Sequence, residues 1–239
     1  MKIACWSGPR NISTALMYAF SNRADCGAVD EPFYAAYLER TGKDHPMRAE
    51  ILASQPRDPA AVVAALCGSN PAELPHVYHK HMAQHMLPGL WGDWVSEMVH
   101  VILIRHPARV VSSFRKGYAE AGLEDVGFVQ LAEIYDDLTA RVLDPVIVEG
   151  SDVRADPEGM LRALCDRIGL AWDPAMLQWP AGPKDVDGVW APVWYGAVHQ
   201  STGFAGPEGE LPDLDGVARE MAEAAIPHYE KLRARKLVV

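Results

Sequence analysis

The sequence has little positive charge. It contains 22 lysines and arginines against 32 aspartates and glutamates, which gives a formal net charge of −10 at pH 7. Proteins that bind nucleic acid over a broad surface usually carry an excess of basic residues, so this composition argues against such a role. An anionic ligand would need a local basic pocket.

Cysteines and long apolar runs are also scarce. The four cysteines, Cys5, Cys26, Cys67 and Cys165, are scattered and form no CxxC pair. We therefore expect reduced, buried thiols, as in a cytoplasmic protein, and no cysteine-based metal site. No apolar run reaches the length of a membrane span, and the first residues lack the pattern of a signal peptide.

What the sequence does contain is an alternation of strand-like and helix-like segments. The run 98–106 has the dense apolar centre of a strand buried on both faces. Such alternation predicts an α/β fold, a three-layer sandwich with a central, mainly parallel sheet, in a single domain spanning 1–239. The expected strands are 2–6, 76–81, 98–106 and 144–150, and the expected helices are 12–23, 32–40, 58–68, 107–118, 127–142, 156–170 and 213–236.

Residues 179–212 interrupt this alternation. They are rich in glycine, proline and tryptophan and show no helical or strand period. A loop of this length in a compact domain is usually functional or disordered, and its aromatic residues favour a packed, functional loop. The alternative is that these aromatic side chains only extend the core.

The segment WSGPRNIST, residues 6–14, lies between an expected strand and an expected helix. Free backbone N–H groups and the positive end of a helix bind phosphate at such a turn. In a nucleoside triphosphatase the pattern would be GxxxxGK[ST]. Counted from Gly8, however, Thr14 stands in place of the lysine and Ala15 in place of the magnesium-binding hydroxyl. Ordinary ATP or GTP hydrolysis is therefore disfavoured, and a turn without a ligand remains the alternative.

A second segment, ILIRHPARVVSSF, residues 102–114, resembles the 3′-phosphate-binding segment of the sulfotransferases. In that family an arginine at a strand end and a serine in the next helix hold one phosphate, and here they are Arg105 and Ser113. The guanidinium offers a planar fork of donors and the serine adds a hydroxyl. A structural ion pair would explain the arginine alone, but not the proline and serine that follow it.

Further segments carry the same resemblance. The opening loop is similar to the family's 5′-phosphosulfate loop, with Ile12 in place of a small glycine. The segment DEPFY, 30–34, resembles the Glu-Pro segment of bacterial sulfotransferases. Residues 145–170 resemble a late strand and helix of the family. The resemblance implies the P-loop-type sulfotransferase fold, with 179–212 as a lid over the nucleotide. The implied nucleotide-binding residues are Ser7, Gly8, Pro9, Arg10, Asn11, Ile12, Ser13, Thr14, Arg105, Ser113, Tyr195, Ser201, Thr202 and Gly203.

The chemistry that the resemblance implies is sulfuryl transfer. The co-substrate would be 3′-phosphoadenosine 5′-phosphosulfate, the acceptor a small molecule with a hydroxyl or amine, and no metal would be required. Arg10 would stabilise the charge that grows on the leaving oxygen. The base that takes the acceptor's proton is expected to be Glu31 first and His81 second, and Lys80 would hold the sulfuryl group.

Two other interpretations stay open. One is an unusual P-loop kinase or nucleotide hydrolase, and the other is a nucleotide-binding homologue without transfer activity. The histidines at 76, 79, 81 and 85 also raise the question of zinc, but no nearby cysteine or carboxylate completes a tetrahedral ligand set, so no metal site is expected. The acceptor pocket is expected in 31–45, 79–95 and 115–130, where Trp91, Trp94 and Tyr118 suggest an apolar or ring-bearing acceptor.

Overall fold

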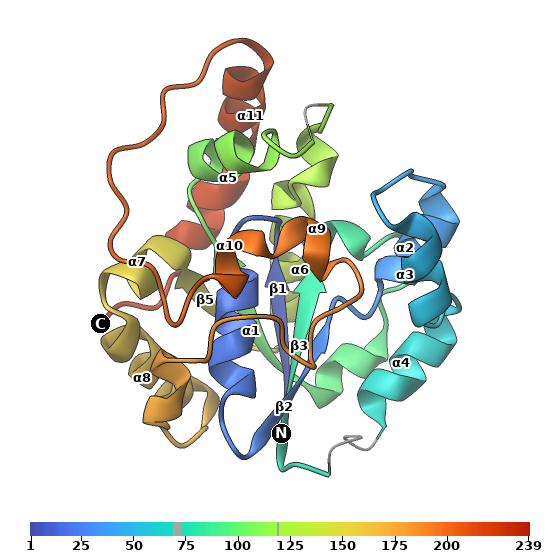
Figure 1. Cartoon of the computed structure of the whole chain (residues 1–239), viewed down its shortest axis with the longest axis vertical. Helices are drawn as coiled ribbons and strands as arrows, with labels where there is room; N and C mark the ends of the chain where they lie inside the picture. The colour runs from blue at the N-terminus through green and yellow to red at the C-terminus, as the bar shows by residue number, and fades with distance from the viewer. Residues whose placement is uncertain (69–72, 119) are drawn as a thin grey trace.

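A five-stranded sheet forms the centre of the protein. The computed structural model describes residues 1–68, 73–118 and 120–239. The strands are β1 (Lys2–Ser7), β2 (Cys26–Asp30), β3 (His76–Met82), β4 (Val99–Ile104) and β5 (Val146–Glu149). Their order in the sheet is β2-β3-β1-β4-β5, and each pair of neighbours is parallel (Figure 1). The predicted α/β fold with a parallel sheet is confirmed.

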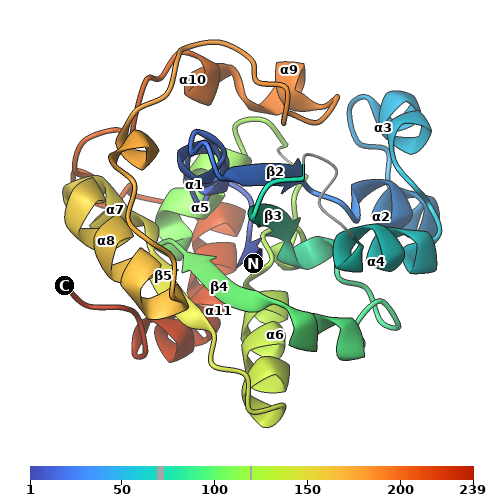
Figure 2. The ribbon, with the colours of Figure 1, turned by 90° about the horizontal axis from the view of Figure 1, so that it is seen from below.

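Helices cover both faces of this sheet, because the strands are apolar on both faces. In β1, for example, Ile3 and Cys5 face one core, and Ala4 and Trp6 face the other. The first core is closed by α1 (Ser13–Ser21), α7 (Gly150–Ala155) and α8 (Pro157–Ile168). The second is closed by α4 (Pro59–Cys67), α5 (Pro107–Phe114), α6 (Phe128–Ala140) and α11 (Gly216–Arg233). Figure 2 shows the resulting layers.

A smaller apolar cluster lies beside the edge strand β2. It joins α2 (Tyr34–Thr41) and α3 (Arg48–Ser54) to the segment that the sequence marked as a loop. That segment contains two one-turn helices, α9 (Ala191–Trp194) and α10 (Gly196–His199). Trp190 and Tyr195 are buried there, so the aromatic residues of 179–212 are packed.

Several elements differ from those expected. Strand β2 and helices α3 and α7 lie where the sequence predicted none, and α5 ends at Phe114, four residues early, because 115–117 form a turn. Short 3-10 turns are η1 (Ala83–His85), η2 (Asp93–Glu97), η3 (Leu123–Asp125) and η4 (Pro174–Leu177). Within the described residues, no helix is long and apolar enough to cross a membrane.

The parallel arrangement brings the carboxyl ends of the strands to one edge of the sheet. Arg10 follows β1, Glu31 follows β2, and Arg105 follows β4. Helices α9 and α10 lie near the end of β3 at the same edge, drawn in orange in Figure 1. In an open α/β sheet this edge is where ligands bind.

Candidate active site

The loop after β1 has an unusual backbone. Arg10 and Ile12 have φ angles of 62° and 59°, in the left-handed region, which costs a β-branched isoleucine on the order of 1 kcal/mol. The Asn11 side chain, which is buried, anchors the loop by donating from Nδ2 to the Leu103 carbonyl at 3.1 Å. The loop therefore follows a tight path even though it carries Ile12 where the resemblance implies a small glycine.

Gly8 and the start of α1 complete this loop. A Cβ atom at Gly8 would lie 2.3 Å from the Val126 carbonyl oxygen, so only glycine fits there. Helix α1 begins at Ser13, and the Ile12 side chain does not cap it. The first backbone N–H groups of a helix have no partner within the helix, and without a side-chain cap they can bind an anion.

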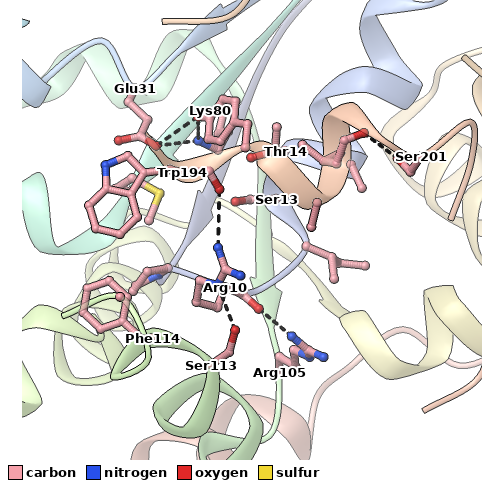
Figure 3. Close-up of a pocket in the computed structure, with 18 of the residues that line it drawn as sticks. Arg10, Ser13, Thr14, Glu31, Lys80, Arg105, Ser113, Phe114, Trp194 and Ser201 are labelled. Atoms are coloured by element: carbon pink, nitrogen blue, oxygen red, sulfur yellow. Dashed lines mark hydrogen bonds and ion pairs between the residues drawn. The ribbon is translucent and has the colours of Figure 1, made fainter. Parts of the chain in front are cut away.

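Arg10, Ser113 and Arg105 lie next to one another beside this loop (Figure 3). Arg10 Nε donates to Ser113 Oγ at 2.9 Å, and Arg105 Nη1 donates to the Arg10 carbonyl at 2.8 Å. Arg10 Nη1 also reaches the Trp194 carbonyl at 3.5 Å. Burial, together with the Arg105 charge, lowers the pKa of Arg10. Two segments that the sequence singled out separately thus meet in space.

These residues open onto one cavity, with a volume of about 330 Å³. Twelve of the expected site residues line it: Pro9, Arg10, Ile12, Ser13, Thr14, Glu31, Lys80, Arg105, Ser113, Tyr195, Ser201 and Gly203. Five others, Ser7, Gly8, Asn11, His81 and Thr202, are not among the described residues that line it. Of these, Gly8 and Asn11 shape the loop from behind.

Lys80 and Glu31 form a buried ion pair at one end of the cavity. Lys80 Nζ lies 2.5 Å from Glu31 Oε1 and 2.8 Å from Asp30 Oδ1, and it is 1% exposed. Glu31 has a φ angle of 41°, which is strained for a glutamate. Strained residues with buried charges cluster at functional sites.

Lys80 and Glu31 each have a shifted pKa. Burial raises the pKa of Glu31; the Lys80 charge opposes this rise and the Asp30 charge adds to it. Burial alone would lower the pKa of Lys80, but Asp30 and Glu31 raise it above its ordinary value. Lys80 therefore stays charged, beside a carboxyl whose pKa is raised by burial.

Tyr195 connects the 179–212 segment to this pair. Its hydroxyl donates to Asp30 Oδ2 at 2.7 Å and lies 2.8 Å from Lys80 Nζ. The Gly188 N–H donates to the same Asp30 oxygen at 3.1 Å, and Trp190 Nε1 donates to the Tyr195 hydroxyl at 3.0 Å. Asp30 is thus fully hydrogen-bonded, whereas Glu31 Oε2 faces His85 Nδ1 at 4.0 Å.

His81 points away from the cavity. Because side chains alternate along a strand, His81 lies on the face of β3 opposite Lys80. It is 1% exposed and stacks on Trp6, with ring centroids 4.2 Å apart. Burial holds its pKa well below the ordinary value. The second base candidate is therefore a packed, neutral side chain in this structure.

The remaining histidines also have separate places. His85 lines the cavity and stacks between Tyr34 and Tyr37, at 4.5 and 4.6 Å. His79 is buried, and burial lowers its pKa to about 4. Across the part of the chain that the structure describes, no three His, Cys, Asp or Glu side chains are placed to share a metal ion.

Aromatic side chains line the same cavity as the ion pair. They include Tyr34, Phe114, Tyr118 and Trp194. Trp91 and Trp94, which the sequence offered as acceptor contacts, pack around Trp6 instead, with centroids at 5.2 and 6.2 Å. Of the three suggested aromatic contacts, only Tyr118 lines the cavity.

Some of the residues that the site brings together were not singled out from the sequence. Asp30 precedes Glu31 and binds the same lysine, and Arg154 lines the cavity from the unexpected helix α7. A signal for Asp30 existed, since it directly neighbours a candidate base. Nothing in the sequence marked Arg154.

Solved structures of similar fold include two sulfotransferases. The sulfotransferase domain from the curacin biosynthetic pathway superposes with a TM-score of 0.57 at 17% identity, covering 93% of this chain and 96% of that one. The sulfotransferase from Alicyclobacillus acidocaldarius superposes with a TM-score of 0.56 at 14% identity, covering 98% and 96%. At these identities the likeness concerns the fold.

Two sequence relatives come from Arabidopsis thaliana. They are named branched-chain-amino-acid aminotransferase-like proteins 1 and 2, and they are 39% and 37% identical over 97% of this chain. The chain spans 41% of the length of each relative. The family description "Sulfotransferase domain" matches residues 1–236. The chain therefore belongs to the sulfotransferase domain family.

Proposed function

We propose that this protein transfers a sulfuryl group from 3′-phosphoadenosine 5′-phosphosulfate to a hydroxyl or amine of a small acceptor. One observation carries the proposal: a single cavity is lined by the phosphate-type loop, by Arg105 with Ser113, and by the buried pair Lys80–Glu31. The first two features suit the two ends of the nucleotide, and the third suits proton removal from an acceptor.

The nucleotide would lie along the Arg10 side of the cavity. The N–H groups of residues 11–14 and the hydroxyls of Ser13 and Thr14 would bind the 5′-phosphate, since α1 begins there without a side-chain cap. Arg105 and Ser113 would bind the 3′-phosphate. Ser201 and Gly203 line the cavity beside them and are further candidates for nucleotide contacts.

The transfer itself breaks one bond to sulfur and forms another. The acceptor oxygen or nitrogen attacks sulfur in line, and the bond from sulfur to the 5′-phosphate oxygen breaks. Arg10 stabilises the charge that remains on that phosphate oxygen. Glu31 takes the acceptor's proton on Oε2, the oxygen turned away from Lys80. Lys80, held by Asp30 and Tyr195, orients Glu31 and the sulfuryl oxygens.

The aromatic lining of the cavity favours a particular class of acceptor. Tyr34, Phe114, Tyr118 and Trp194 offer aromatic faces, which stack on rings or cover apolar groups. We therefore propose a ring-bearing or otherwise apolar small molecule with a nucleophilic oxygen or nitrogen.

The 179–212 segment would act as a lid within a single domain. Trp194 of α9 and Val198 of α10 line the cavity, as does Tyr195 between these helices, and Tyr195 hydrogen-bonds to Asp30. Since Cys5, Cys26, Cys67 and Cys165 are all free thiols, we also propose that the protein works in a reducing compartment such as the cytoplasm.

Calorimetric titration with 3′-phosphoadenosine 5′-phosphate, in a buffer that contains a metal chelator, tests the nucleotide site. We expect binding without metal, weaker binding of AMP, and at least about tenfold weaker binding by Arg105→Ala, because a charge-assisted pair to phosphate is lost. The control is Arg162→Ala, since Arg162 is exposed on α8 and pairs with Glu158. Equal affinity for both nucleotides would refute the 3′-phosphate site, and dependence on magnesium would favour a kinase.

A further inference from the structure

Glu208 is buried, although most of the segment around it is exposed. It lies in 204–215, which joins α10 to α11 and contains no helix or strand. Residues 205–207 and 209–211 are all exposed, whereas the Glu208 side chain is only 3% exposed. A lone carboxylate is removed from water only where charged partners hold it.

Three arginines hold this carboxylate. Glu208 Oε1 accepts from Arg105 Nε at 2.9 Å and from Arg154 Nη1 at 2.8 Å, and Oε2 lies 2.7 Å from Arg109 Nε. Burial favours the protonated form of Glu208, but the hydrogen bond and charge of Arg105, with the charges of Arg109 and Arg154, keep its pKa below the ordinary value. The cluster thus retains a surplus of two positive charges.

The same arginines also hold the backbone around Glu208. Arg154 Nε donates to the Gly206 carbonyl at 2.9 Å, and Arg109 Nη2 donates to the Gly209 carbonyl. Two of the three, Arg105 and Arg154, line the cavity proposed to bind the nucleotide. The segment is therefore held to the cavity wall by the Glu208 carboxylate and by the backbone carbonyls of Gly206 and Gly209.

The proposed 3′-phosphate site is occupied from within the protein. Arg105 is engaged by Glu208, and Ser113 accepts a hydrogen bond from Arg10 Nε. A phosphate monoester carries more charge than a carboxylate and has three terminal oxygens, so it suits three guanidinium groups better. A donor phosphate and the Glu208 carboxylate need the same donors.

We propose that Glu208 stands in for the nucleotide's 3′-phosphate and is displaced when the nucleotide binds, and that Arg109 and Arg154 then hold that phosphate together with Arg105. This inference rests on the proposed function. Displacement removes the Glu208 carboxylate as an anchor of 204–215, so nucleotide binding and loosening of this segment are coupled. A nucleotide without a 3′-phosphate leaves Glu208 in place.

Calorimetry on Glu208→Gln tests this competition. We expect 3′-phosphoadenosine 5′-phosphate to bind roughly tenfold more tightly to the variant than to the unchanged protein, because no charged competitor has to leave. The affinity for AMP should change less than about twofold, since AMP does not compete with Glu208. The matched control is Glu210→Gln, which removes the same charge from an exposed position two residues away.

The outcomes separate this inference from the proposed function. If 3′-phosphoadenosine 5′-phosphate binds the unchanged protein but binds Glu208→Gln equally or more weakly, Glu208 is not a competitor and the proposed function stands. If AMP gains as much as the 3′-phosphorylated nucleotide, the effect is one of general charge and the inference is wrong. Binding to neither protein overturns both proposals.

A second measurement uses the unchanged protein and so does not depend on how the variant folds. A glutamate-specific protease must bind the glutamate side chain to cleave after it, and Glu208 is held in the arginine cluster while Glu210 is exposed. We expect 3′-phosphoadenosine 5′-phosphate to raise cleavage after Glu208 several-fold relative to Glu210, as measured by mass spectrometry, and AMP not to do so. An unchanged or lower ratio overturns the displacement.

Discussion

Lys80 Nζ and Glu31 Oε1 lie 2.5 Å apart at the carboxyl edge of the sheet, and both side chains are buried. Lys80 reaches this site from the face of β3 opposite His81, whereas Glu31 is held by a strained backbone just after β2. Burying an ion pair costs desolvation energy that is repaid only with good geometry. Here two carboxylates and a tyrosine hydroxyl supply that geometry.

Replacement of Glu31 by glutamine should strongly slow transfer but spare nucleotide binding. The amide keeps the shape of the side chain but cannot take a proton, and loss of a general base reduces the rate by about 10²–10⁴-fold. The measurement is release of 3′-phosphoadenosine 5′-phosphate with phenols and other ring-bearing acceptors, alongside calorimetric binding of that product. Glu39→Gln, on the exposed side of α2, is the matched control. Retained transfer in Glu31→Gln would exclude it as the base.

His81→Phe should leave transfer within about threefold of the unchanged protein. Neither ring nitrogen of His81 has a hydrogen-bond partner in the described structure, and the ring stacks on Trp6 in the core. Phenylalanine preserves the stacking and removes two buried polar atoms, so stability should stay equal or rise by about 1 kcal/mol. Urea unfolding and the same transfer assay check both points. A loss of activity as large as that of Glu31→Gln would restore His81 as a base candidate.

Gly8→Ala should disturb the phosphate loop through its backbone. The added methyl group would lie 2.3 Å from the Val126 carbonyl oxygen, a backbone atom that cannot turn aside. We expect a loss of about 1–3 kcal/mol in the free energy of unfolding, as for other overpacked sites, and weaker binding of 3′-phosphoadenosine 5′-phosphate. Gly206→Ala is the control for stability, because nothing lies within 4 Å of its added Cβ. Equal stability of the two variants would contradict this account of the loop.

The parts of the fold that could be predicted from sequence are those with long apolar runs. Strand β4 is recognisable because five of its six residues are buried. Strand β2 was missed because it is a short edge strand whose central residues are only partly buried and include Gly27. Helix α7 has six residues, too few to show a helical period.

The candidate site could be predicted only where its residues stand in local motifs. Arg10 and Arg105 each follow a strand that the sequence predicted, so their place at one edge of the sheet followed from the parallel topology. Glu31 follows β2, which was not predicted, and only its resemblance to the Glu-Pro segment singled it out. The contact of Tyr195 with Asp30 joins residues 165 positions apart, and the contact of Glu208 with Arg105 joins residues 103 apart. Such pairs depend on how the 179–212 segment packs, which no local pattern encodes.

The pH dependence of stability should report the raised pKa of Glu149. This residue ends β5, is 2% exposed, and accepts a hydrogen bond from the Tyr229 hydroxyl at 2.9 Å. Burial raises the pKa of Glu149 from 4.5 to about 7, against the smaller opposing effect of the Tyr229 hydrogen bond. The folded protein thus holds a proton that the unfolded chain releases, and stability is lost as the pH rises through this interval.

Glu149→Gln removes this titration. As the pH rises from 5 to 8, the unchanged protein should therefore lose about 2–3 kcal/mol in its free energy of unfolding relative to the variant. Urea unfolding at several pH values measures it, and Glu223→Gln, an exposed position on α11, should show no such shift. A difference independent of pH would mean that Glu149 titrates alike in the folded and unfolded chains, and would contradict the raised pKa.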